Sequence, residues 1–273
     1  MRHLELFAGI GGFRRAMDLL TQDHIMDFHC IGYSEIDAKA VKTYCANYHP
    51  EVDGELAMGD IVEFTSNKNN MDNLPQFDLV TGGFPCQTFS MMGKQAGFNE
   101  DRGQMFFHII DILAAKMPRY VLLENVKNLK SHDKGRTFAR IKQELEALGY
   151  QVFTDIFNTA QFHLPQTRNR LLIFATTEPV PADFEVQFTC DNIAGLFDQV
   201  YQDLGTYHYQ SVNDILSLDV DQKYFLSERI KPTLLADGSA NFKSKSDINM
   251  SIARPLTATM HKMHRACQDN YYS

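Results

Sequence analysis

The sequence predicts an α/β protein with a mostly parallel sheet, helices on both faces, and a smaller irregular region that follows. Short apolar runs alternate with segments of helical periodicity as far as about residue 178, a pattern typical of parallel strands joined by helices. Beyond Glu178-Pro179-Val180-Pro181 the periodicity weakens and turn-forming residues become more frequent. We therefore expect two domains, 1–178 and 179–273, the second partly β.

The elements of the first domain follow from apolar runs and stop signals. A buried run at 3–7 leads into a Gly-rich turn at 9–12 and an amphipathic stretch, and the same strand-then-helix pattern recurs. Pro118 stops the helix before it, and Gly149 ends a helix whose apolar residues share one face. In order, we expect strands at 3–7, 30–33, 77–81, 120–123, 152–157 and 171–175, and helices at 13–20, 37–48, 104–117 and 136–148.

Composition excludes several classes of protein. With 273 residues, 44% hydrophobic and 22% charged, the chain is neither collagen, coiled coil nor bulk disorder. Its formal charge of −8 argues against a general nucleic-acid binder, although a local basic face remains possible. The five cysteines form no C-x-x-C pair, so we expect a reducing compartment and no metal site. Glu5 is atypical of a secretory signal and no apolar run reaches about 18 residues, so we expect a cytoplasmic protein without membrane association.

The first candidate site is the Gly-rich turn at residues 6–12, LFAGIGG. Glycines let the backbone approach a ligand closely and adopt positive φ. A dinucleotide fingerprint would need glycine where Arg14 stands, so S-adenosylmethionine, which needs no phosphate cradle, is the alternative ligand. Glu35 ends the second strand, where a carboxylate can accept from ribose hydroxyls, and Asp60 could accept from an adenine amine. A purely structural turn would give the same pattern.

The second candidate site is the loop that follows the strand at 77–81. Cys86, in the segment GFPCQTFS, is a candidate nucleophile at the carboxyl edge of the sheet, although free cysteines are more often small buried hydrophobes. Glu124 closes the strand that starts at Tyr120 and would point into the same crevice. Arg168 and Arg170 alternate, so they share one face as a strand begins. Two guanidiniums there suit a phosphate and a polar oxygen, but a solvated edge is the other interpretation.

Together these motifs resemble the DNA (cytosine-5)-methyltransferase family. The motifs Phe-x-Gly-x-Gly, Pro-Cys-Gln, Glu-Asn-Val and Gln-x-Arg-x-Arg are each weak alone, but the ordered set is highly specific. The likeness is strong over 1–178 and loose over 179–273. It implies a Rossmann-like S-adenosylmethionine-dependent methyltransferase sheet followed by a partial target recognition domain. It also implies transfer of a methyl group to C5 of a flipped-out cytosine in duplex DNA.

The resemblance assigns roles to the catalytic residues. Cys86 would add to C6 of the cytosine, and Glu124 would contact N3 and the exocyclic amine. Arg170 would hold the cytosine O2, where negative charge develops. Arg168 would help to position the loop or a phosphate.

The resemblance also implies two sets of binding residues. Ile36 departs from the family, because many relatives place a tryptophan there. The residues implied for the cofactor S-adenosylmethionine are Phe7, Gly9, Gly11, Glu35, Ile36, Asp60, Ile61 and Pro85. Those implied for DNA are Gln87, Ser90, Met92, Lys94, Arg102, Arg254 and Thr257.

The end of the sequence departs from the family pattern. Residues 251–258, SIARPLTA, resemble a short strand of the recognition domain, and nearby lysines, arginines and histidines suit DNA backbone contact. The family's later Arg- and Glu-containing segment and its final Gly-Asn-Ser motif are not found. A truncated chain and a split enzyme both explain this, and we expect the split form, with a smaller second polypeptide carrying those motifs.

Three other functions fit parts of the pattern. A tRNA cytosine-5 methyltransferase keeps the chemistry but changes the substrate, and Phe84 before Pro85 favours the DNA branch. A non-catalytic DNA-binding module would not need the set formed by Cys86, Glu124 and Arg170. A nicotinamide dehydrogenase is disfavoured because Arg14 interrupts its fingerprint.

Overall fold

The computed structural model describes residues 1–85, 105–204, 209, 211–236, 247–256 and 269–273. The chain forms two compact units, the first made of Met1–Ile156 and Arg170–Thr189 and the second of Phe157–Asn169 and Cys190–Ser273. The domain boundary expected at residue 178 stays a prediction. No helix in the described part of the chain is both long and apolar enough to cross a membrane.

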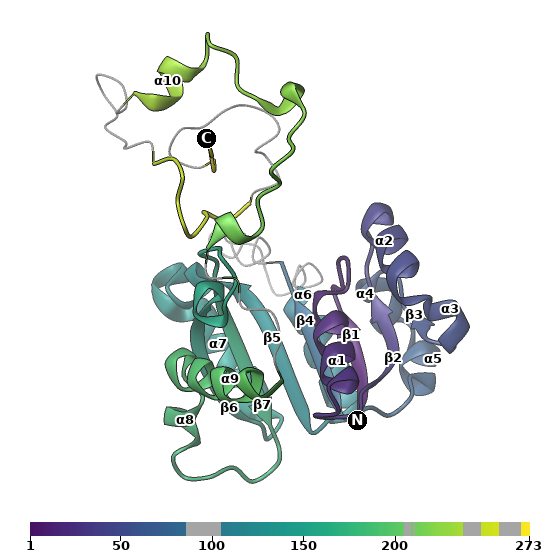
Figure 1. Ribbon diagram of the computed structural model, residues 1–273. Helices are drawn as coiled ribbons and strands as arrows, with labels where there is room; N and C mark the ends of the chain where they lie inside the picture. The colour runs from purple at the N-terminus through teal and green to yellow at the C-terminus, as the bar shows by residue number, and fades with distance from the viewer. Residues whose placement is uncertain (86–104, 205–208, 210, 237–246, 257–268) are drawn as a thin grey trace. The chain divides into compact units, whose positions relative to one another are not determined.

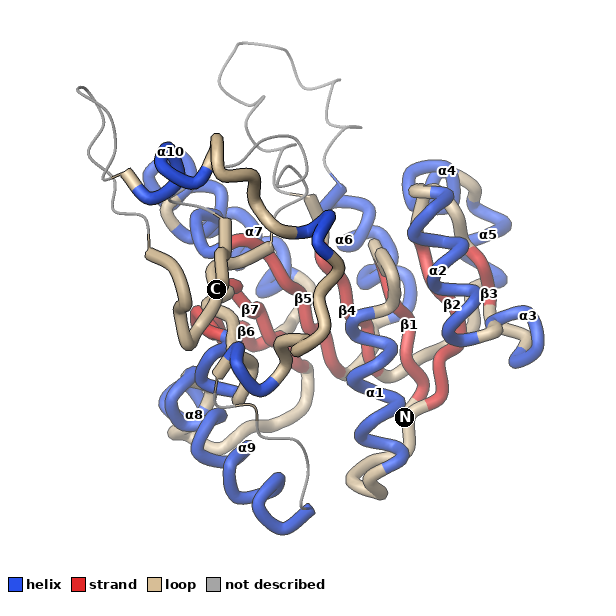
Figure 2. The backbone as a smooth tube through the Cα atoms, turned by 45° about the horizontal axis from the view of Figure 1, so that its top comes forward, coloured by secondary structure: helices blue, strands red, loops and turns tan. Residues whose placement is uncertain are grey.

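One mixed sheet organises the fold. Its seven strands lie side by side in the order β3-β2-β1-β4-β5-β7-β6 (Figures 1 and 2). The pairs β3–β2, β2–β1, β1–β4 and β4–β5 are parallel, whereas β7 runs antiparallel to β5. The strands are β1 Arg2–Leu6, β2 His29–Ser34, β3 Leu56–Ala57, β4 Leu79–Gly83, β5 Tyr120–Val126, β6 Gln151–Asn158 and β7 Asn169–Thr176.

Helices begin and end where the sequence provides caps and breakers. The carboxylate of Asp37 accepts hydrogen bonds from two backbone N–H groups at the start of α2, and that of Asp60 accepts one, from Val62, at the start of α4. Gly149, at φ 89°, lies two residues after the end of the helix Arg136–Ala147. The helices are α1 Gly12–Gln22, α2 Ala38–Tyr48, α3 Pro50–Asp53, α4 Ile61–Ser66, α5 Lys68–Asn73, α6 Met105–Lys116, α7 Arg136–Ala147, α8 Phe184–Gln187, α9 Cys190–Leu204 and α10 Lys231–Leu235.

The two faces of the sheet differ in character because side chains alternate along a strand. Leu4 and Leu6 of β1 are fully buried in an apolar core with residues of α4, α6 and α7. His3 and Glu5, which alternate with them, are also buried. Glu5 accepts a hydrogen bond from the backbone N–H of Arg14 in α1, at 3.3 Å. One face is therefore an ordinary apolar core, and the other holds buried polar groups beneath α1.

The second unit contains more helix than the sequence indicated. In α9, Cys190, Ala194 and Phe197 follow helical spacing, the first two are buried, and Phe197 packs edge-on against Phe162 with ring centroids 5.4 Å apart. His163 and Asp198 are linked at 2.6 Å. The segment that resembles a recognition-domain strand forms only an isolated bridge between Ala253 and Gln166 in the described part of this unit. The described part of the second unit also holds two three-residue 3₁₀ turns and the short helix α10.

Candidate active site

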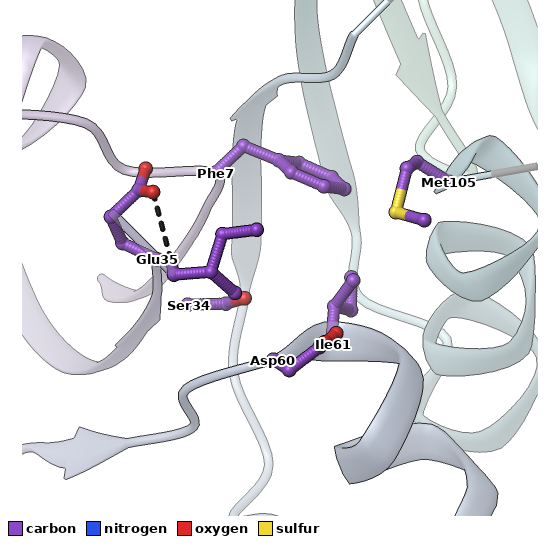
Figure 3. Close-up of a pocket in the computed structure, with 7 residues that line it drawn as sticks. Phe7, Ser34, Glu35, Asp60, Ile61 and Met105 are labelled. Atoms are coloured by element: carbon purple, nitrogen blue, oxygen red, sulfur yellow. Dashed lines mark hydrogen bonds between the residues drawn. The ribbon is translucent and has the colours of Figure 1, made fainter. Parts of the chain in front are cut away.

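A pocket lies at the carboxyl ends of β1 and β2. It is lined by Phe7, Ser34, Glu35, Ile36, Asp60, Ile61 and Met105 (Figure 3). Figure 3 shows the Phe7 ring extending toward Met105. Asp60 and Ile61, at the start of α4, lie below the Phe7 ring in this view. Apolar surfaces and two carboxylates thus surround a space at the sheet edge where doubly wound folds bind ligands.

The Glu35 carboxylate is held by backbone N–H groups. One oxygen accepts from Gly9 at 2.8 Å, and the other accepts from Ile36 and from Asp37, both at 2.8 Å. The first bond ties the end of β2 to the turn after β1. The carboxylate is therefore fixed in direction before any ligand arrives, which lowers the entropy that binding would cost.

The Gly-rich turn is shaped by positive φ angles and by a tyrosine. Phe7, Gly9 and Gly11 have φ values of 53°, 57° and 89°. The Tyr48 hydroxyl donates to the Gly11 carbonyl at 2.7 Å. A Cβ at Gly11 would lie 2.2 Å from the Tyr48 ring, so only glycine fits at this position.

A cluster of charged side chains around Arg14 packs next to this turn. The Arg14 side chain forms an ion pair with Glu55, whose side chain is 1% exposed. It also pairs with Asp18 at 2.9 Å and lies over the Tyr48 ring, 5.4 Å from its centroid. Burial raises the pKa of the nearby Glu5 carboxyl to about 7, although hydrogen bonds from the α1 backbone oppose the shift. Arg14, which breaks the dinucleotide fingerprint, therefore links α1 to the segment before β3.

An ion pair lies at the carboxyl end of β5. Arg170 of β7 donates to the Glu124 carboxylate in an ion pair whose side chains are about one-quarter exposed, 24% and 27%. The antiparallel register, with Glu124 opposite Leu172 and Val126 opposite Arg170, puts both charged residues on one face. The two predicted residues are thus in direct contact.

The end of β4 leads into the predicted nucleophile segment next to this pair. Gly83 lies opposite Glu124 in the parallel register, and a Cβ at Gly83 would be 3.2 Å from the carboxylate. The Asn125 side chain, 3% exposed, donates to the Phe84 carbonyl at 2.8 Å. These contacts attach the chain just before Cys86 to the strand that carries Glu124.

The remaining predicted residues divide into three groups. Pro85 is exposed at the end of a described segment. Arg168 belongs to the second unit, as does Arg254, whose guanidinium binds Asp247 at 3.2 Å and the Asp269 carbonyl at 3.2 Å. The residues that lie outside the described part of the chain are Cys86, Gln87, Ser90, Met92, Lys94, Arg102 and Thr257.

Sequence reasoning missed several site residues. Met105 and Ser34 line the pocket, Tyr48 closes over Gly11, and Asn125 anchors the chain at Phe84. Asn125 stands in the Glu-Asn-Val motif and could have been found there. The other three have no local signal, because only tertiary packing brings them to the site. Among the described residues, no group of three or more His, Cys, Asp or Glu side chains could hold a metal ion.

The chain is similar in sequence to bacterial and phage methyltransferases. Type II methyltransferase M1.ScrFI of Lactococcus lactis subsp. cremoris is 38% identical over 83% of this chain and 51% of its own length. M.NlaX of Neisseria lactamica is 37% identical over 83% of this chain and 63% of its own. The chain spans about half the length of several curated relatives it matches, 46% of the phage methyltransferase M.Rho11sI for example.

Solved structures support the fold. The crystal structure of the Schizosaccharomyces pombe Dnmt2 methyltransferase aligns with a TM-score of 0.67 at 19% identity, over 98% of this chain and 74% of that one. The Entamoeba histolytica methyltransferase EhMeth aligns with a TM-score of 0.68 at 18% identity, over the same shares. These likenesses confirm the Rossmann-like methyltransferase fold expected from the sequence. The C-5 cytosine-specific DNA methylase family matches residues 1–273 throughout, and the chain belongs to that family.

Proposed function

We propose that this chain transfers a methyl group from S-adenosylmethionine to C5 of cytosine in duplex DNA, as the catalytic part of a restriction-modification methyltransferase. The observation that carries the proposal is the Glu124–Arg170 pair beside the chain that leads to Cys86. An acid and a guanidinium at one strand edge can bind the polar edge of a pyrimidine, because one accepts from its amine and the other donates to its carbonyl. Family membership and the Type II methyltransferase relatives support this substrate.

The pocket fits S-adenosylmethionine by its apolar surfaces and its two hydrogen-bond-accepting carboxylates. Phe7 and Ile61 offer apolar surface for an adenine ring, and the exposed residue Ile36 at the rim, 73% exposed, can pack on its other face. Glu35 would accept from the ribose hydroxyls and Asp60 from the adenine amine. Gly9 and Gly11 would line the methionine end, and Pro85 its methyl side. When bound, S-adenosylmethionine supplies an electrophilic methyl group.

The residues of this chain would activate the base. The Cys86 thiolate adds to C6 of the cytosine and forms an Sγ–C6 bond, and C5 thereby gains enamine character. Glu124 supplies a proton at N3 as the thiolate adds, and Arg170 stabilises the charge at O2. After C5 is methylated, the C5 proton passes to solvent water and the Sγ–C6 bond breaks, which restores the aromatic ring and the thiolate. The N3 proton returns to Glu124.

The proposal includes contacts with DNA outside the catalytic pair. The target cytosine must leave the duplex to reach the strand edge. Gln87, Ser90, Met92, Lys94 and Arg102 would lie against the opened duplex. Arg168, Arg254 and Thr257 would contact its backbone or recognition site. We also propose that a smaller second polypeptide carries the family's later motifs, as expected from the sequence.

Methyl transfer from tritiated S-adenosylmethionine tests the substrate directly. We expect incorporation into duplex DNA but not into tRNA, and a stable adduct with 5-fluorocytosine DNA that Cys86→Ser abolishes. Arg170→Ala should lower kcat by about 10² to 10³ because a donor to the developing charge is lost. Assays of the chain alone and of a co-purified complex test the second polypeptide.

The matched control is Arg119→Ala. Arg119 also pairs with a carboxylate, Asp78, at 3.1 Å, but at the opposite end of β5. This variant should retain wild-type kcat. Equal losses from both arginine variants would indicate a structural effect, and preferential methylation of tRNA would contradict the proposed substrate.

A further inference from the structure

The turn after β5 displays three exposed lysines. We propose that Lys127, Lys130 and Lys134, called here the lysine turn, bind the phosphate backbone of the DNA substrate beside the active site. The inference rests on the proposed function, because the ligand is the DNA that carries the target cytosine. The lysine turn lies in the first compact unit, in two 3₁₀ turns that join β5 to α7.

Buried residues fix the backbone of the lysine turn. Leu129 is fully buried, and Thr137 at the start of α7 is 6% exposed. His132 and Thr137 are linked through Nδ1 and Oγ1 at 2.7 Å. The lysine side chains are exposed between these anchors. A backbone held in this way presents cations at set positions, so binding would not need to order the turn first.

The charges of the segment do not cancel. Residues 127–136 contain four Lys or Arg and one carboxylate, Asp133, in a chain whose formal charge is −8. Asp133 pairs with Arg136 rather than with a lysine. None of the three lysines has an ion pair with another described residue. The positive charge of the lysine turn is therefore available to an anion from outside.

The local backbone adds a second observation. Asp133 and Lys134 adopt left-handed φ values of 50° and 56°, and Gly135 follows at 85°. Consecutive left-handed non-glycine residues are unfavourable and persist where the surrounding structure determines them, often at functional sites. Gly135 is also the N-cap of α7, and no side chain caps that helix end. The N–H groups of the first turn thus add partial positive charge near Lys134.

The position of the turn fits a phosphate contact near the target nucleotide. β5 ends at Val126, two residues after Glu124, and Lys127 follows directly. If Glu124 contacts the extruded base, the sugar-phosphate backbone that carries this base must pass close to the end of β5. Lysines there would hold the register of the strand without reading its sequence.

The salt dependence of DNA binding tests the inference. Affinity of the full chain for a fluorescent duplex is measured by anisotropy between 50 and 200 mM NaCl. Each lysine that contacts a phosphate contributes about 0.9 to the slope of log affinity against log salt. The triple variant Lys127→Gln/Lys130→Gln/Lys134→Gln should therefore reduce the slope by about 2 to 3 and lower affinity at 50 mM NaCl by about tenfold or more.

The control variant is Lys39→Gln/Lys42→Gln/Lys68→Gln, which removes the same charge from exposed lysines of α2 and α5. It should keep the wild-type slope, and both triple variants should bind S-adenosylmethionine as the wild type does. If the wild type methylates DNA, the inference is overturned by an unchanged salt slope in the lysine-turn variant. It is also overturned by equal reductions of the slope in the two triple variants. If the wild type neither binds nor methylates duplex DNA, the proposed function fails as well. Stronger binding of tRNA through the same lysines would overturn the assignment to DNA.

Discussion

Replacement of Glu5 by glutamine should change how stability depends on pH. Burial raises the pKa of the Glu5 carboxyl from 4.5 to about 7, and the residue is only 1% exposed. Ionised Glu5 is therefore less stable in the folded protein than in the unfolded chain. Its contribution is most favourable below pH 4.5 and is lost as the pH rises through 7. A shift of this size corresponds to about 3 kcal/mol, at about 1.4 kcal/mol per pKa unit.

The assay is urea unfolding followed by far-UV circular dichroism between pH 4.5 and 8.5, because the chain contains no Trp. The free energy of unfolding of Glu5→Gln minus that of the wild type should rise by about 3 kcal/mol across this range. Constant differences in packing cancel from this pH dependence. Glu63→Gln, at an exposed carboxylate of α4, should give a flat difference. Parallel pH profiles for wild type and Glu5→Gln would refute the buried-carboxyl argument.

Two further predictions concern neighbouring residues. Gly11→Ala should lower the free energy of unfolding by at least about 2 kcal/mol, since Gly11 has φ 89° and a Cβ would overlap a tyrosine ring. Gly12→Ala, with open space at its Cβ, should stay within about 0.5 kcal/mol in the same denaturation assay, and similar losses would contradict the steric argument. Burial lowers the pKa of His3 from 6.5 to about 3, so wild-type stability should fall by up to about 5 kcal/mol relative to His3→Gln as the pH drops through this range. Identical acid unfolding curves would exclude that contribution.

The longer strands and helices of the first 178 residues could be predicted because each has a clear apolar period, whereas the short elements α3, β3, α4 and α5 were not among those expected. The helix expected at 136–148 is α7 at Arg136–Ala147, and the strand expected at 171–175 is β7 at Asn169–Thr176. Helix α9 was not predicted. Its apolar positions are interspersed with Asn192, Gly195 and Gln199, which weaken the periodicity.

The candidate site was partly predictable for the same reason. Residues at strand ends, such as Glu35 and Glu124, can be placed at a common edge from the strand order alone. The polar face beneath α1 could not be predicted. Glu5 interrupts an apolar run and argues only against a secretory signal, whereas its burial depends on how Arg14 and Tyr48 pack in three dimensions.

The division of the chain has a consequence for engineering. The backbone crosses from one compact unit to the other after Ile156, after Asn169 and after Thr189. The second unit could not be exchanged between relatives through a single junction, because residues 157–169 would remain with the first unit of the other parent. A functional chimera would need all three junctions, with the insert at 157–169 and the segment from Cys190 onward taken from the same parent.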